Sequence, residues 1–238
     1  MLQKLKRILR KKLLGYDVST YFFSQSGEDQ ILHSIFGKKF QHSEKGFYID
    51  IGSYHPYHHS NTFMFYLNGW NGINIDARPG SKMLFDNKRP KDINLEMGVG
   101  PHQNTLKYYL IDENSTMNSF SKENLERIGM LKHVKKEILI DVYPLRVILA
   151  QHLPKNVNRI DFLSIDVEGF ELEVLKSNDW KKYRPIAVCV ELSIKRIDEL
   201  GENEVHQYLE SLEYDSVGKT IVADHTSTII YLDKNYQI

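Results

Sequence analysis

The chain has 238 residues, of which 41% are hydrophobic and 26% charged, a composition typical of one globular domain. Its 31 basic and 31 acidic side chains cancel, so no overall field attracts nucleic acid. The single cysteine, Cys189, cannot form an intramolecular disulfide, and we expect a reducing, cytoplasmic setting. No run approaches the roughly 20 apolar residues that a membrane-spanning helix needs.

Residues 1–20 form a basic segment in which Leu2, Leu5, Leu9 and Leu13 recur at helical spacing among lysines and arginines. This spacing predicts a basic amphipathic helix. It is not a secretory signal, in which cations precede an uninterrupted apolar block. Such a helix either makes a peripheral contact with the inner membrane surface or packs on its own domain with a solvated basic face.

Residues 21–238 are predicted to be a single α/β domain. It opens with a helix that Ser24 or Ser26 caps, with acids in its first turn. Short apolar runs rich in β-branched residues follow, and they predict parallel strands covered on both faces. These runs are residues 47–51, 72–75, 93–95, 160–165 and 186–191.

Helical segments alternate with these strands, which predicts right-handed crossovers and a doubly wound sheet. They are residues 62–67, 82–87, 172–175 and 202–212. A final pair of runs, 214–222 and 226–232, predicts an antiparallel hairpin at one edge and brings the sheet to seven strands.

Residues 101–154 are more than a plain crossover needs, and we interpret them as an insertion over the carboxyl edge of the sheet. The segment contains a strand at 106–111, a polar loop at 112–121, a helix at 122–130 and a strand at 137–142. The loop is rich in hydroxyls and amides between Ser115 and Ser119. It is either a lid over a ligand or an ordinary solvated loop.

The predicted strands end in residues that suit S-adenosylmethionine, and ligands of such sheets bind at these ends. Gly52 lets the backbone approach a ligand closely. Asp50 can meet the cationic methionine end, and Asp76, about one β-α-β unit later, can accept both ribose hydroxyls. Glu96 and Met97 could flank adenine. Taken one at a time, each of these residues is more commonly a turn residue or a helix cap. The prediction of an S-adenosylmethionine site therefore depends on the order in which they occur.

The motifs that carry these residues resemble the FkbM family of methyltransferases. They are SQSGED at 24–29, GFYIDIG at 46–52, HP at 55–56, SNT at 60–62, GWNGINIDARPG at 69–80, DINLE at 92–96 and IDFLSIDVEGFELEVL at 160–175. The resemblance spans about residues 20 to 195. It implies a Rossmann-like class I methyltransferase fold and transfer to an oxygen, often of a sugar hydroxyl in a surface glycan or natural product.

The strand ends and the family motifs together provide a set of candidate cofactor-binding residues. They are Gln25, Glu28, Asp50, Gly52, Ser53, Asn61, Thr62, Asp76, Ala77, Arg78, Glu96, Met97 and Asp166.

A sugar hydroxyl is a weak acid, so methyl transfer to it needs a base or a metal. Asp166 and Glu168 alternate along an extended segment and are expected to point the same way. Their repulsion raises a pKa or, with Glu191, invites a divalent cation such as Mg²⁺. The alternative is that both only cap the next helix. His55 is a third catalytic candidate, expected to face the acceptor, although its loop lacks a zinc-site pattern.

Two other functions remain open at this point. Asp166-Val167-Glu168 could be the metal motif of a nucleotide-sugar glycosyltransferase, but this leaves Asp50 and Asp76 unexplained. A catalytically silent module could keep the fold and the cofactor. No Gly-x-Gly-x-x-Gly follows the first strand, which disfavours a dinucleotide, and no phosphate loop is present.

Overall fold

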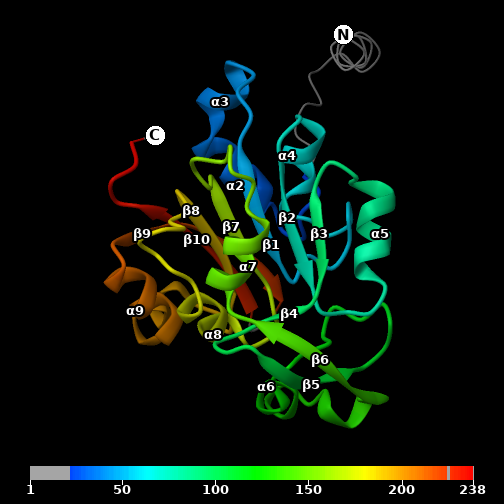
Figure 1. Ribbon diagram of the computed structural model, residues 1–238. Coiled ribbons are helices and arrows are strands. Elements are labelled where there is room, and N and C mark those ends of the chain that lie inside the picture. The colour runs from blue at the N-terminus through cyan, green and yellow to red at the C-terminus, as the bar shows by residue number, and fades with distance from the viewer. Residues whose placement is uncertain (1–21, 224–225, 238) are drawn as a thin grey trace, which may run out of the picture.

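One seven-stranded sheet runs through the middle of the molecule (Figure 1). Its strands are β1 (Phe47–Ile51), β2 (Asn71–Asp76), β3 (Ile93–Glu96), β7 (Phe162–Ile165), β8 (Ala187–Leu192), β9 (Tyr214–Ala223) and β10 (Thr226–Asp233). The computed structural model describes residues 22–223 and 226–237, so the predicted basic helix at 1–20 lies outside the described residues.

The strand order is β3-β2-β1-β7-β8-β10-β9. All neighbouring pairs are parallel except the two that β10 makes, with β8 and β9. The order reverses at β1, because β2 and β3 lie on one side of it and β7 and β8 on the other. This confirms the predicted doubly wound, mostly parallel Rossmann-like sheet. The switch point places a crevice at the carboxyl ends of β1 and β7.

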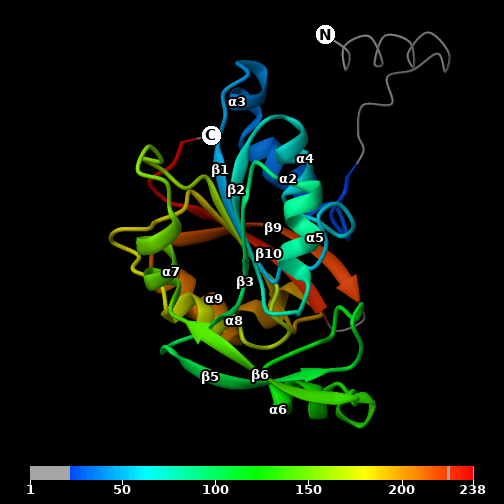
Figure 2. The ribbon, with the colours of Figure 1, turned by 45° about the vertical axis from the view of Figure 1, so that its right-hand side comes forward.

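Helices cover both faces of the sheet (Figure 2). On one face lie α2 (Glu28–Ile35), α3 (Gly37–Gln41), α4 (Phe63–Leu67) and α5 (Ser81–Lys88). On the other lie α7 (Leu145–His152), α8 (Glu171–Lys176) and α9 (Glu204–Ser211).

Alternation of side chains along β1 explains the two layers. Tyr48 joins the apolar cluster beneath α2 and α4, whereas Phe47, Ile49 and Ile51 join the cluster beneath α7, α8 and α9. All five β1 residues are buried. Asp50 points to the same side as Tyr48, because successive side chains of a strand alternate between faces.

A smaller, three-stranded sheet lies beyond the carboxyl ends of the parallel strands, at the bottom of Figure 1. It is formed by β4 (Gly98–Val99), β5 (Asn104–Leu110) and β6 (Lys136–Tyr143), with α6 (Lys122–Arg127) and the 3₁₀ turn η1 (Leu131–His133) between β5 and β6. Most of the segment predicted as an insertion, from β5 to β6, therefore lies beyond this edge, whereas its last part forms α7 on a face of the main sheet.

The helix predicted over 202–212 is present as α9, and a 3₁₀ segment, η2 (Ile197–Glu202), precedes it. Asn203 separates the two, because its side-chain oxygen accepts hydrogen bonds from the backbone N–H groups of Val205 and His206 and so caps α9. Helix α7 is not among the predicted elements, although Pro144 precedes its first turn.

No helix within residues 22–223 and 226–237 is long and apolar enough to cross a membrane.

Candidate active site

Two adjoining cavities lie between the carboxyl ends of the parallel strands and the smaller sheet. The first is lined by the ends of β2 and β3, including Asp76, Ala77, Arg78 and Met97. The second, of about 710 Å³, is lined by the ends of β1, β7 and β8. They share a wall formed by Gly52, Tyr54, Thr116, Asp166 and Glu168. The cavities therefore meet at the switch point of the sheet.

Gly52 holds the turn after β1 against the turn after β7. Its φ is +76°, and its N–H donates to the Ile75 carbonyl at 2.9 Å. A Cβ at this position would lie 1.7 Å from the Asp166 carbonyl oxygen. Only glycine fits here, because both the left-handed backbone and the close approach exclude a side chain.

Asp50 lies behind this turn and borders the second cavity. It is 5% exposed, and its Oδ2 accepts a hydrogen bond from the Thr62 hydroxyl at 2.7 Å. Burial raises the pKa of Asp50, while the Thr62 hydrogen bond and the positive charge of Arg89 oppose the rise. Asn61, from the same loop as Thr62, donates to the Ser164 hydroxyl at 3.1 Å and lines the cavity.

Asp76 is buried at the end of β2 and organises the first cavity. Its carboxylate accepts hydrogen bonds from the backbone N–H groups of Tyr54 at 2.7 Å and Arg78 at 2.8 Å. The Arg78 guanidinium lies 5.1 Å from the centre of the Tyr54 ring and donates to the carbonyls of Tyr54 and Glu113. The loops that follow β1 and β2 are thus held together by the Asp76 carboxylate. Its remaining lone pairs can still accept hydrogen bonds from a group in the cavity.

Glu96 and Met97, predicted as a pair, occupy different places. Met97 lines the first cavity. Glu96 is exposed, does not line either cavity, and accepts hydrogen bonds from the N–H groups of Gly80 at 2.9 Å and Lys82 at 3.3 Å. Glu96 therefore stabilises the start of α5, where a negative charge also suits the helix dipole.

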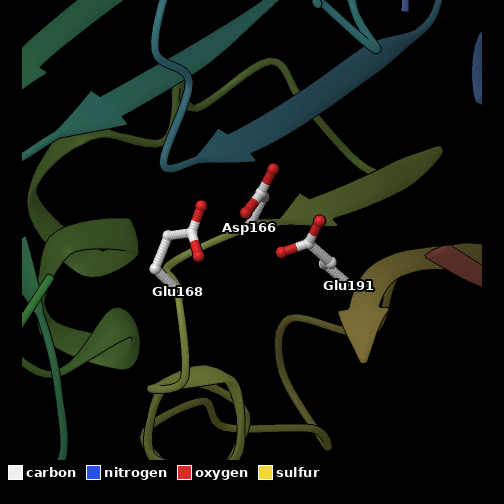
Figure 3. A group of neighbouring side chains, drawn as sticks. All are labelled: Asp166, Glu168 and Glu191. Atoms are coloured by element: carbon white, nitrogen blue, oxygen red, sulfur yellow. The ribbon is translucent and has the colours of Figure 1, made fainter. Parts of the chain in front are cut away.

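Asp166, Glu168 and Glu191 form a carboxylate cluster where the two cavities meet (Figure 3). Each can place an oxygen within 4.8 Å of the other two. The expected reason for their approach is wrong, because β7 ends at Ile165 and Glu168 is left-handed, with a φ of +55°. A turn, not an extended strand, brings the side chains together.

The alternative that Asp166 and Glu168 merely cap α8 is also wrong. The residue at the cap of α8 is Phe170, and no side chain bonds there. Glu171 accepts hydrogen bonds from the N–H groups of Val167 and Gly169 at 3.2 and 3.0 Å. The backbone of this turn is therefore satisfied without the two carboxylates.

Burial raises the pKa of all three clustered carboxyls, and neighbouring negative charges raise it further. For Asp166 the pKa is raised to about 7, by burial first and then by the charge of Glu171, while a hydrogen bond with Glu191 opposes the rise. The same bond raises the pKa of Glu191 further. Glu191 is thus the carboxyl that keeps its proton, and Asp166 ionises first.

The remaining predicted residues divide into those at the cavity wall and those behind it. Gln25 and Ser53 line the second cavity, and the Ser53 hydroxyl is buried without a hydrogen-bond partner among the described residues. Glu28 lies behind the wall, where the Thr220 hydroxyl and the Ser26 N–H bond to it. Thr62 is likewise fully buried behind Asp50.

His55 lies outside both cavities, contrary to the expectation that it faces the acceptor. Its Nδ1 accepts hydrogen bonds from the N–H groups of Tyr57 at 3.3 Å and His58 at 3.2 Å. Burial first, and then the neighbouring His58 charge, lower its pKa. These bonds fold the loop back on itself and occupy the Nδ1 atom of His55 within it.

Several lining residues were missed by reading the sequence. Tyr54 borders both cavities, and its hydroxyl donates to the Asn114 carbonyl at 3.0 Å. Arg127, from α6, lines the second cavity and donates to the Ser193 hydroxyl at 2.7 Å. No local feature of the sequence indicated that Arg127 lines a cavity. The polar loop, which its composition marked as either a lid or a solvated loop, contributes Thr116 to both cavities.

Comparison with known proteins agrees with this geometry. The methyltransferase FkbM domain family matches residues 50–216, well over half of the chain, which confirms the resemblance of the motifs. No curated protein sequence matches the chain.

Solved methyltransferase structures are distantly similar. A TehB-like SAM-dependent methyltransferase from Corynebacterium glutamicum is 8% identical, with 98% of this chain and 97% of that chain covered and a TM-score of 0.42. An O-methyltransferase from Bacillus cereus in complex with SAH is 10% identical, with 96% of this chain and 89% of that chain covered and a TM-score of 0.40. A human methyltransferase 10 domain containing protein is 11% identical, with 97% of this chain and 93% of that chain covered and a TM-score of 0.41. Similarity this distant carries no information on the acceptor.

Proposed function

Because the chain belongs to the FkbM methyltransferase family and is therefore an S-adenosylmethionine-dependent methyltransferase, we propose that it methylates a hydroxyl of a sugar, in a surface glycan or natural product. The cofactor supplies a methyl group already activated by a cationic sulfur. The protein must bind that donor, align the acceptor hydroxyl, exclude water and accept one proton. Alignment alone can contribute about 7–11 kcal/mol.

The residues of the two cavities fit the cofactor. Gly52 presents backbone without a side chain to both cavities, and the unpartnered Ser53 hydroxyl lies buried in the wall of the second cavity. Asp76 in the first cavity suits the ribose hydroxyls, with Met97 beside the adenine. Asp50 in the second cavity suits the cationic methionine end. A hydrogen bond to a charged group contributes about 1.5–3 kcal/mol.

The carboxylate cluster supplies the proton acceptor. Asp166 and Glu168 lie on the wall that both cavities share, and Glu191 lines the second cavity. A cofactor that spans both cavities would hold its methyl group near this wall, where an acceptor hydroxyl in the larger second cavity could meet it. A base is most effective when its pKa is near the working pH, and that of Asp166 is raised to about 7. We therefore assign Asp166 as the general base, with Glu168 beside it to orient the hydroxyl.

A divalent cation such as Mg²⁺ is the alternative route to the same end. The spacing of Asp166, Glu168 and Glu191 allows one oxygen from each to reach a common ion, and oxygen ligands suit Mg²⁺. Such an ion would lower the pKa of the acceptor hydroxyl. Loss of turnover on adding EDTA, restored by Mg²⁺, would favour this route; turnover unchanged by EDTA favours Asp166 as the base.

The single observation that carries the proposal is the meeting of both cavities at Gly52 and the carboxylate cluster. Calorimetric titration with S-adenosylhomocysteine and, separately, with UDP tests the cofactor. Heat with S-adenosylhomocysteine alone is expected. Binding of UDP alone would instead support the nucleotide-sugar glycosyltransferase, for which the family match offers no support.

Transfer of label from methyl-labelled S-adenosylmethionine to glycan fractions tests the reaction. Asp166→Asn is expected to lower the rate about 100-fold or more, which is the usual contribution of a general base, while S-adenosylhomocysteine still binds. Glu123→Gln is the matched control, because Glu123 is an exposed carboxylate of α6. Binding of the cofactor without transfer to any of a wide panel of glycans would favour a catalytically silent module.

A further inference from the structure

Arg89 is a fully buried arginine at the end of α5, on the Tyr48 side of the sheet. Its Nε pairs with Asp92 at 2.7 Å, and its Nη2 donates to the Tyr48 hydroxyl at 2.6 Å. Its Nη1 instead lies on the side nearer Asp50, where it donates to the Thr62 hydroxyl at 3.0 Å. The ion pair with Asp92 thus uses only one side of the planar guanidinium.

Thr62 links this arginine to Asp50. The Thr62 hydroxyl lies 2.7 Å from Asp50 Oδ2 and 3.0 Å from Arg89 Nη1. An arginine only donates, and an ionised carboxylate only accepts. The single hydroxyl proton must therefore point to Asp50 while the oxygen accepts from Arg89, so the hydrogen bonds run in one direction, from guanidinium to hydroxyl to carboxylate.

We propose that Arg89 and Thr62 are positioning residues that keep Asp50 ionised and oriented for the cationic methionine end of the cofactor. This inference rests on the proposed function, since it needs Asp50 to face the cofactor. Neither residue touches the cavities: Arg89 and Thr62 are 0% exposed, and neither lines the wall. They act only through Asp50.

Asp50 needs such support because burial opposes its charge more strongly than its further hydrogen bond with Ser164 favours it. A carboxylate that is 5% exposed has lost most of its hydration, which favours the protonated form. Arg89 is the cation whose charge favours ionisation of Asp50. The titratable groups that face Asp50 from the surrounding elements and repel its charge when they are ionised are Asp92, Asp166 and Cys189. Removing the hydroxyl link is therefore expected to raise the pKa of Asp50.

Thr62→Val tests the link, because valine keeps the shape of threonine and removes the hydroxyl. Calorimetric titration with S-adenosylhomocysteine, between about pH 6 and about pH 9, should show binding weakened about ten- to a hundred-fold near neutral pH, the equivalent of one hydrogen bond to a charged group. The deficit should shrink as pH rises, because Asp50 then ionises without help. Thr62→Ser should bind like the unaltered protein.

Thr105→Val is the matched control. Thr105 makes the same hydroxyl-to-carboxylate bond, to Asp141 at 3.0 Å, but on the exposed small sheet, so its removal should leave binding unchanged. A purely structural Thr62 would reduce stability without changing the pH profile of binding. An unchanged affinity and profile in folded Thr62→Val would overturn the inference. If the unaltered protein does not bind S-adenosylhomocysteine, the proposed function fails, and this inference with it.

Discussion

At the scale of single residues, the site depends on positions where packing or backbone conformation is tightly constrained. Gly52 is the clearest, since the turn after β1 and the turn after β7 touch there. The carboxylate cluster depends on the left-handed Glu168, whose carbonyl accepts hydrogen bonds at 2.8 Å from both Ser119 and Asn124. These bonds come from the segment between β5 and α6 and from α6 itself. A strained residue of the main domain is therefore held by the segment that covers it.

Gly52→Ala is expected to abolish cofactor binding and to destabilise the fold by about 1–3 kcal/mol, as overpacking usually does. The new Cβ would lie 1.7 Å from the Asp166 carbonyl oxygen, so one of the two turns must move. Binding is measured with S-adenosylhomocysteine and stability by urea denaturation. Gly201→Ala is the control, because nothing lies within 4 Å of a Cβ there. Normal binding by Gly52→Ala would show that the turns have room to separate.

At the scale of elements, the segment between β5 and α6 acts as a roof fastened to the parallel strands. Arg78 and Tyr54 fasten it, since the first donates to the Glu113 carbonyl at 2.9 Å and the second to the Asn114 carbonyl at 3.0 Å. The roof covers the wall that both cavities share, so it would exclude water from the transfer. Whether it opens to admit the cofactor depends on these few bonds.

Arg78→Met is expected to release the roof and to speed dissociation of S-adenosylhomocysteine about tenfold, the equivalent of one lost hydrogen bond of about 1.4 kcal/mol. Stopped-flow displacement measures the rate, and hydrogen exchange over residues 112–118 should rise in parallel. Arg146→Met removes a comparable bond to a carbonyl, that of Ser177 at 3.1 Å, away from the cavities. It should change neither measurement. Unaltered exchange in Arg78→Met would mean that other contacts hold the roof.

At the scale of the whole molecule, the three clustered carboxyls couple stability to pH. Each has a raised pKa in the folded state. Below the ordinary carboxyl pKa of about 4, both the folded and the unfolded chain hold these protons. As pH rises, the unfolded chain releases them first, and stability is lost until the folded-state pKa is passed. For Asp166 this window ends at about 7 and for Glu168 at about 9.

The free energy of unfolding is therefore expected to fall by about 1 kcal/mol or more between about pH 5 and about pH 8. Glu191→Gln should reduce this slope, because it removes a carboxyl that takes up a proton on folding while keeping a hydrogen-bonding side chain. Urea denaturation across the pH range measures both. Glu123→Gln, at an exposed position, should retain the original slope. A slope unaffected by Glu191→Gln would contradict the coupling.

The amino-acid sequence by itself determined the layers of this protein and the residues at the ends of β1 and β2 that line the cavities. The apolar runs at 47–51, 72–75 and 186–191 matched strands of the main sheet within a residue or two. Asp50, Gly52 and Asp76 were placed correctly at adjacent strand ends, where they line the cavities. These features are local: burial of a strand and the turn after it depend on residues that are neighbours along the chain.

Only the tertiary structure decided what depends on distant segments meeting. The turn at Glu168, and not strand alternation, assembled the carboxylate cluster with Glu191. His55 bonds within its own loop and lines neither cavity. Hydrogen bonds to the start of α5 hold Glu96, which also lines neither cavity. Arg89 reached Thr62 across 27 residues of sequence. No pattern in the chain encodes such contacts directly, because they arise when packing fixes the direction of each side chain.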